Sequence, residues 1–225
     1  MKKVVMALTN VDHYLEHPER KTGVWLEEAA NFYDVLTKAG CEVVFASTKG
    51  GRIPIDPASA DAGAAVQKIA DSEGFRKGMQ ESIPFVKLQP RDYAAIYFCG
   101  GHGAMWDFPT NKDLLSLAEA IYADGGYIAS VCHGEAGLIH LQAADGTSLV
   151  RGKKINGFTN EEEKLNGTAQ MVPLSPEDEL KKAGAEFVKG NPYTEFVVED
   201  QRFITGQNPM SSRKVAETLV RALQK

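Results

Sequence analysis

The stretch Ala129-Ser130-Val131-Cys132-His133-Gly134-Glu135-Ala136-Gly137 places a cysteine between an apolar segment and a segment that suits a helix. The first residues are typical of a buried strand, and we expect the helix to begin at His133. A sharp strand-to-helix turn with a cysteine at the junction is the thiol counterpart of a nucleophile elbow, and Gly134 leaves room for it. The stretch therefore predicts an α/β protein in which Cys132 stands above the carboxyl ends of the strands, where open α/β sheets bind ligands.

The surroundings of Cys132 are expected to favour its ionised form. The first turn of the following helix aims unpaired N–H groups and the positive end of the helix dipole at the sulfur, which predicts a lowered thiol pKa. A buried structural cysteine is the alternative interpretation. Cys99 falls in an apolar strand segment and Cys41 at the start of another, and both are expected to be core thiols. Three cysteines without a CxxC spacing predict neither a disulfide framework nor a structural zinc site.

The rest of the chain alternates short β-branched segments with amphipathic segments of helical length, which is typical of parallel strands joined by crossover helices. We expect strands over 3–8, 42–47, 94–99, 127–132 and 154–158, and a hairpin of 195–198 with 202–205. We expect helices over 22–39, 111–123, 135–141 and 211–223. Thr22 is the expected N-cap of the first helix, and Gly40 is expected to end it.

Length and composition favour one large domain over residues 1–225, because 43% of the residues are hydrophobic. Residues 50–90 are polar and rich in turn signals, and they predict an insertion that caps the sheet edge or the site. The net charge of −5 and the absence of basic clusters argue against a nucleic-acid partner. No apolar segment approaches the roughly 18 residues of a membrane helix. We therefore expect a cytoplasmic protein with no membrane partner.

A glycine-rich segment, Gly100-Gly101-His102-Gly103, follows a second apolar strand. Its glycines let the backbone approach a small ligand and present N–H groups to it. We expect the N–H groups of Gly101 and His133 to form an oxyanion hole facing Cys132. An ordinary glycine-rich turn is the alternative interpretation. The candidate residues of the oxyanion hole and substrate pocket are Gly101, His102, Gly103 and Trp106, the last of which either lines the pocket or fills the core.

The positions of the histidines restrict the choice of general base. No histidine follows His140, so the chain lacks the downstream His-x-Glu that class I glutamine amidotransferases use. The remaining candidate is His133, beside Cys132, and such a base needs a third group to orient it. Acidic candidates cluster at Glu161-Glu162-Glu163, and a solvated surface position is the alternative interpretation for two of these carboxylates.

Glu28 is a further candidate acid. It falls on the largely apolar face of the first helix, whereas Glu27 is expected to face solvent. Burial would raise the pKa of Glu28 and let its carboxyl donate a hydrogen bond to a thiolate or carry a proton. An exposed helix glutamate is the alternative interpretation, because buried glutamates are rare.

His13 and His17 have the i, i+4 spacing that binds a metal ion when the segment is helical. Pro18 and the loop-like composition argue against a preorganised site. We therefore predict no metal site.

Together these segments resemble the PfpI/ThiJ superfamily, which has a class I glutamine amidotransferase-like fold. The segments that carry the resemblance are 21–28, 100–103, 131–134, 157–163 and 204–209. The resemblance implies a flavodoxin-like three-layer sandwich with a mainly parallel central sheet. The Lys-Thr-Gly, Gly-His-Gly and Thr-Gly-x-Asn-Pro elements are most similar to the glutathione-independent glyoxalase branch, whose members are also described as stress chaperones and deglycases.

Carried over by position, the resemblance implies four roles: Cys132 as nucleophile, His133 as base, Glu163 as the orienting acid and Glu28 as the protonated partner of the sulfur. When Thr159 is aligned with the threonine of the family, the orienting acid falls four residues later, at Glu163. Many relatives have proline where this chain has Glu135, which we expect to place a charge at the rim of the site. The implied substrates are 2-oxoaldehydes such as methylglyoxal, converted to 2-hydroxy acids without a metal or organic cofactor.

The resemblance also implies misfolded or glycated proteins as partners, and a homodimer. Two alternatives remain open from the residues. The same Cys-His-Glu set would suit an amidase or peptidase. An oxidisable Cys132 would suit a redox stress sensor, and a holdase chaperone needs no thiol chemistry at all.

Overall fold

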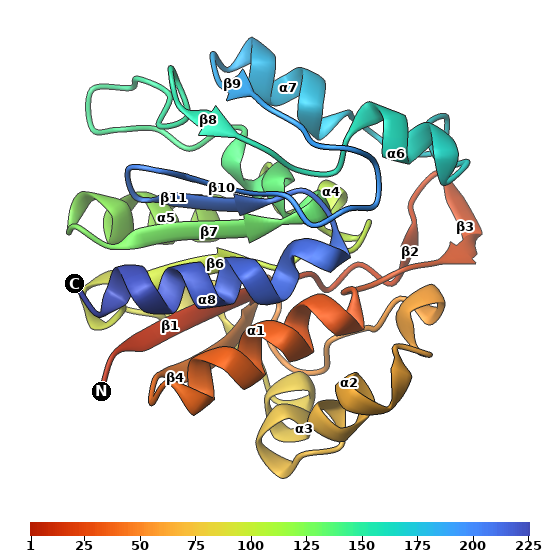
Figure 1. Cartoon of the computed structure of the whole chain (residues 1–225), viewed down its shortest axis with the longest axis horizontal. Coiled ribbons are helices and arrows are strands. Elements are labelled where there is room, and N and C mark those ends of the chain that lie inside the picture. The colour runs from red at the N-terminus through yellow and green to blue at the C-terminus, as the bar shows by residue number, and fades with distance from the viewer.

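The computed structural model describes residues 1–225 and has a central seven-stranded sheet in the order β10-β11-β7-β6-β1-β4-β5 (Figure 1). Every neighbouring pair in this sheet is parallel except β10 with β11. The sheet strands are β1 (Lys3–Leu8), β4 (Glu42–Ser47), β5 (Ile83–Pro84), β6 (Ala95–Phe98), β7 (Tyr127–Val131), β10 (Val197–Asp200) and β11 (Phe203–Gly206). The predicted α/β class with a mainly parallel sheet is confirmed.

Helices cover both faces of the sheet because the central strands are apolar on both sides. In β1, Val4 and Met6 belong to the core beneath α1 (Leu26–Lys38) and α8 (Ser212–Leu223). Val5, in between, belongs to the opposite core, which includes the apolar residues of α5 (Lys112–Ala123). Figure 1 shows α1 and α8 side by side on one face. The result is the three-layer sandwich implied by the resemblance.

The first helix begins later than predicted. It starts at Leu26, with Trp25 as an N-cap that makes no side-chain capping bond. The hydroxyl of Thr22 instead donates to Asp56 at 2.9 Å, and the N–H of Val24 donates to the carbonyl of Pro54. These bonds hold the segment before Leu26 extended, so the N-cap role expected for Thr22 is wrong.

Residues 50–90 form several short elements, one of which, β5, pairs with β4 at the edge of the sheet. They are η1 (Pro57–Ser59), α2 (Gly63–Ala70), α3 (Glu73–Gln80), β5, η2 (Phe85–Lys87) and η3 (Pro90–Asp92). Phe75 of α3 packs edge-on against Phe45 of β4, with ring centroids 5.5 Å apart. The role of this segment as a capping insertion stays a prediction.

The remaining elements lie outside the central sheet (Figure 1). They are the hairpin β2 (His13–Tyr14) and β3 (His17–Lys21), α4 (Ala104–Asp107), η4 (Cys132–Leu138), β8 (Lys154–Ile155), α6 (Asn160–Leu165), α7 (Pro176–Lys182), β9 (Glu186–Phe187) and η5 (Pro209–Ser211). The strand expected over 154–158 is only two residues long and pairs with β9 outside the central sheet. The helix expected over 135–141 is a 3₁₀ helix that starts at Cys132. None of the helices combines the length and apolar content needed to cross a membrane.

Candidate active site

Cys132 lies where β7 meets η4, and its backbone is strained. Its φ of 56° is in the left-handed region, which non-glycine residues rarely adopt and which is often found at functional sites. The turn also needs Gly134, because a Cβ there would lie 2.2 Å from the carbonyl oxygen of Phe98. The geometry is that of a nucleophile elbow.

His133 connects Cys132 to Glu163. Nδ1 of His133 lies 3.3 Å from Sγ of Cys132, and Nε2 lies 2.7 Å from Oε2 of Glu163. All three residues are buried. The structure therefore brings together the nucleophile, base and orienting acid that the resemblance implied.

A capping box at the start of α6 fixes the direction of Glu163. The hydroxyl of Thr159 accepts from the N–H of Glu162, and the carboxylate of Glu162 accepts from the N–H of Thr159. The other oxygen of Glu162 accepts from Tyr193 and Asn208. Glu162 is fully buried, so surface exposure for two of the three clustered glutamates is wrong: only Glu161 is exposed.

His102 contacts the same carboxylate from the other side. Its Nε2 lies 2.9 Å from Oε1 of Glu163, and its ring centroid is 3.9 Å from that of His133. Burial, together with the nearby His133, lowers the pKa of His102 to about 4, so the ring is neutral at neutral pH. Burial would raise the pKa of Glu163, but His133 and His102 together hold it well below its usual value. This shared carboxylate was not predicted from the sequence.

Glu28 reaches the site from α1 and is fully buried. The N–H of Gly100 donates to its Oε2 at 2.8 Å. A Cβ at Gly100 would lie 2.6 Å from that oxygen and 2.9 Å from Cβ of Cys132. Only glycine therefore fits at position 100, between the Glu28 carboxyl and Cys132. Burial raises the pKa of Glu28 well above its usual value, which favours the protonated form of the carboxyl. The inward orientation predicted for Glu28 agrees with this geometry.

The lowered thiol pKa expected for Cys132 is wrong. Burial raises the pKa of the thiol well above its ordinary value, and negative charge on Glu28 or Glu135 would act in the same direction. The N–H of His133 favours the thiolate but is outweighed. The sequence indicates a helix N-terminus at the sulfur, but not how deeply that terminus is buried.

Glu135 does not lie at the rim of the site. It is fully buried, its Oε1 lies 3.3 Å from the hydroxyl of Ser130, and its other oxygen has no partner. Gly157 makes room for it, since a Cβ there would lie 2.6 Å from the Glu135 side chain. Burial raises the pKa of Glu135 well above its usual value, which disfavours the charge that we expected at this position.

Two of the other pocket candidates, Gly101 and Gly103, flank His102 in the glycine-rich loop. The N–H of Gly101 makes no hydrogen bond within the protein, as an oxyanion donor requires, and its backbone approaches the carbonyl of Gly23. Gly103 precedes α4 and approaches the carbonyl of Val11. The oxyanion-hole role of Gly101 and His133 stays a prediction.

A cavity of about 470 Å³ opens onto His102 beneath the β2–β3 hairpin. Tyr14 covers His102, with ring centroids 5.4 Å apart, and Trp106 packs edge-on against Tyr14. Trp106 therefore does not line the cavity but packs against Tyr14, which does. The lining residues are Tyr14, Glu19, Arg20, Lys21, Trp25, Asp56, Pro57, Ala58, His102 and Asn166. Most of them come from polar segments whose sequence carries no signal for a pocket.

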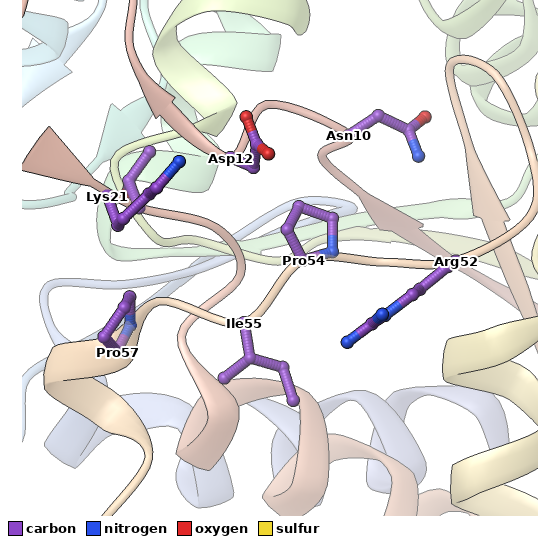
Figure 2. Close-up of a pocket in the computed structure, with 8 residues that line it drawn as sticks. Asn10, Asp12, Lys21, Arg52, Pro54, Ile55 and Pro57 are labelled. Carbon is purple, nitrogen blue, oxygen red and sulfur yellow. The ribbon is translucent and has the colours of Figure 1, made fainter. Parts of the chain in front are cut away.

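A neighbouring cavity of about 420 Å³ contains none of the candidate catalytic residues. It shares Lys21 and Pro57 with the cavity beside His102. Figure 2 shows Lys21 and Arg52 at opposite sides of it, with Pro54 between them. The cavity of about 470 Å³ contains none of Cys132, His133, Glu163 and Glu28 either, but it reaches their neighbour His102, and Glu163 lines a further cavity of about 390 Å³.

His13 and His17 lie on the two short strands β2 and β3, not on a helix, and they do not belong to a cluster of potential metal ligands. Nδ1 of His13 lies 2.6 Å from the carboxylate of Asp12, and His17 lies 3.7 Å from Glu19. The group whose atoms could hold a metal ion is instead His102, His133 and Glu163.

Comparison with known proteins agrees with this geometry. The model of the DJ-1/PfpI family matches residues 22–222. The glutathione-independent glyoxalase HSP31 of Saccharomyces cerevisiae is 32% identical over 99% of this chain and 98% of its own length. A crystal structure of glyoxalase III from Candida albicans superposes with a TM-score of 0.90 at 32% identity, covering 98% and 97% of the two chains. The crystal structure of the Francisella tularensis rapid encystment protein REP24 superposes with a TM-score of 0.95 at 36% identity, covering 99% of each chain.

Proposed function

The chain belongs to the DJ-1/PfpI family, as its sequence motifs indicated, and we propose that it is a glutathione-independent glyoxalase that converts 2-oxoaldehydes such as methylglyoxal to 2-hydroxy acids. Full-length relatives with that name support the proposal. The observation that carries it is the position of Cys132 beside both His133, a candidate base, and the buried carboxyl of Glu28, whose burial favours its protonated form. An isomerisation that moves a proton between two carbons needs both kinds of group.

In the first stage the sulfur of Cys132 bonds to the aldehyde carbon, and the thiol proton passes to Nδ1 of His133. The hydrogen bond from Nε2 to Glu163 stabilises the imidazolium that forms. The developing alkoxide accepts from backbone N–H groups at Gly101 and His133. Transfer of the proton to this oxygen gives a neutral hemithioacetal and restores His133 as a base.

In the second stage His133 removes the proton from the former aldehyde carbon, and Glu28 protonates the neighbouring ketone oxygen. The resulting enediol takes a proton at the second carbon from His133 and returns the hydroxyl proton of the first carbon to Glu28, which gives the thioester of a 2-hydroxy acid. Water hydrolyses the thioester and restores the thiol. The sum is methylglyoxal plus water to lactate, so the reaction consumes no oxidant or reductant.

The burial of Cys132 bears on the redox-sensor alternative. Oxidation by peroxide follows thiolate character and exposure, and this thiol is 3% exposed with a raised pKa. A mechanism in which bound substrate triggers deprotonation suits the site better than spontaneous oxidation.

The test is incubation with methylglyoxal in D₂O without glutathione, followed by identification of the product. We expect lactate, with deuterium at the second carbon where the transferred proton exchanges with solvent. Hydrolysis of acyl or peptide substrates without any lactate would contradict the proposal and favour the amidase alternative.

A further inference from the structure

Glu163 joins two imidazoles, although the reaction needs it to orient only one. Each of its carboxylate oxygens faces a different Nε2: Oε1 faces His102 at 2.9 Å and Oε2 faces His133 at 2.7 Å. All the ligand atoms lie within 4.8 Å of one another, and all three residues are buried. The tertiary fold thus assembles two histidines and one carboxylate with their donor atoms converging.

We propose that His102, His133 and Glu163 form a binding site for Zn²⁺, and that the bound ion inhibits the enzyme without contacting Cys132. Imidazole nitrogen and carboxylate oxygen are ordinary zinc ligands, whereas calcium and magnesium prefer sites built of oxygen alone. Only the inhibitory consequence rests on the proposed function, because binding of the ion depends on the three side chains alone.

To bind zinc, the three side chains must move slightly apart. Zinc binds nitrogen and carboxylate oxygen at about 2.0–2.2 Å, so neighbouring tetrahedral ligand atoms are about 3.3 Å apart. The two hydrogen-bonded contacts of 2.7 and 2.9 Å must therefore lengthen by about 0.5 Å. Open space adjoins two of the ligands, since His102 lines the cavity of about 470 Å³ and Glu163 lines another of about 390 Å³. Water from these cavities would complete the coordination.

Binding would change the tautomer of His133. In the active arrangement Nε2–H donates to Glu163 and Nδ1 accepts the thiol proton of Cys132. A metal ion on Nε2 requires the ring proton to lie on Nδ1 instead. Nδ1–H then points at the sulfur 3.3 Å away, and the thiol proton has no acceptor. The ring keeps the same number of protons, but His133 is lost as a base.

The test is a Zn²⁺ titration of the metal-free full-length protein against a fluorescent chelator. The variants are His102→Gln, Cys132→Ser and, as a matched control, the exposed His140→Gln. We expect His102→Gln to weaken binding at least about tenfold, as the loss of a ligand or its support does. We expect the affinity of the other two variants to equal that of the wild type. Loss of binding in Cys132→Ser with no change in His102→Gln would overturn the proposal in favour of a thiolate site.

A spectroscopic measurement on the wild type tests the same site without depending on how the variants fold. Co²⁺ in place of Zn²⁺ should give d–d bands without the near-ultraviolet charge-transfer band of a cobalt–thiolate bond. A thiolate band, or no metal binding at all, would overturn the site.

The inhibitory consequence is measured separately. Lactate formation should fall with the same Zn²⁺ dependence as binding and return with a chelator. Full turnover with the site occupied would contradict inhibition. Normal Zn²⁺ binding by a protein without any glyoxalase turnover would instead leave the site standing and refute the proposed function.

Discussion

At the scale of single residues, burial disfavours negative charge on Cys132 and Glu28. Burial raises the pKa of both Cys132 and Glu28, while the ionised Glu163 lies on the far side of His133. A thiolate beside an ionised Glu28 would place two negative charges in one dry region. The first proton transfer must therefore go to His133, and Glu28 keeps its proton for the substrate.

Glu28→Gln tests the role of the buried proton. The amide can still accept from the N–H of Gly100 but cannot give up a proton at the rate of a carboxylic acid. We expect lactate formation to fall by about 10² to 10⁴-fold, the usual contribution of a positioned acid, with thermal unfolding little changed. Glu27→Gln, one residue away, is the control. Activity in Glu28→Gln equal to that of the control would contradict the assignment.

Glu135→Gln tests whether a neutral acid lies at this buried position. Because the folded-state pKa is raised, the stability that the protonated carboxyl contributes is full below the unfolded-state pKa and is lost as pH rises toward the folded-state pKa. The amide does not titrate, so the Tm of the variant relative to wild type should increase between pH 4 and pH 8. Thermal unfolding of both proteins between pH 4 and pH 8 measures this difference in Tm. A pH-independent difference would mean that Glu135 does not titrate differently on folding.

At the scale of elements, the short helix α6 positions one of the proposed catalytic side chains. Glu163 belongs to α6, whose start is fixed by Thr159 and Glu162. Thr159→Ala should cost about 1 kcal/mol of unfolding free energy, typical of a lost N-cap, and should also lower kcat because Glu163 shifts from His133. Denaturant unfolding and lactate formation measure the two effects.

The matched control for that variant is Asn111→Ala, which removes the N-cap of α5 away from the site. It should lose similar stability and keep its activity. Equal kcat in both variants would show that the α6 cap does not position Glu163.

The elements also differ in how well the sequence predicts them. Strands β1, β4 and β7 were predicted because their apolar residues are consecutive in the chain, and the Cys132–His133 pair is likewise local. The start of α1 could not be predicted, because it depends on bonds from residues 22–25 to Asp56, Pro54 and Gly100. The His102–Glu163 contact joins residues 61 positions apart, so no local pattern encodes it.

At the scale of the whole molecule, the parallel sheet assembles the site. β6 and β7 are neighbours, so the glycine-rich loop after one strand and the elbow after the other leave the same edge. This places His102 beside His133, and α1 and α6 contribute the two acids. The β2–β3 hairpin covers the site, joined by a 3.0 Å hydrogen bond from Trp106 to Glu16.

Trp106→Phe tests whether the hairpin controls access. The variant keeps an aromatic ring against Tyr14 but loses the bond to Glu16, which is worth about 1 kcal/mol. Cys132 is 3% exposed, so we expect severalfold faster alkylation by iodoacetamide in the variant. Leu15→Ala, at the exposed tip of the hairpin, is the control and should react like wild type. Equal alkylation rates in Trp106→Phe and wild type would contradict this role.

The most direct test of the central claim is a comparison of methylglyoxal conversion to lactate, without glutathione, by wild type and Cys132→Ser. The account predicts steady turnover in wild type and essentially none in the variant, because a serine hydroxyl is a far weaker nucleophile than a cysteine thiol in the same place. Turnover in Cys132→Ser close to that of wild type would contradict it, since the reaction would then proceed without a bond to sulfur.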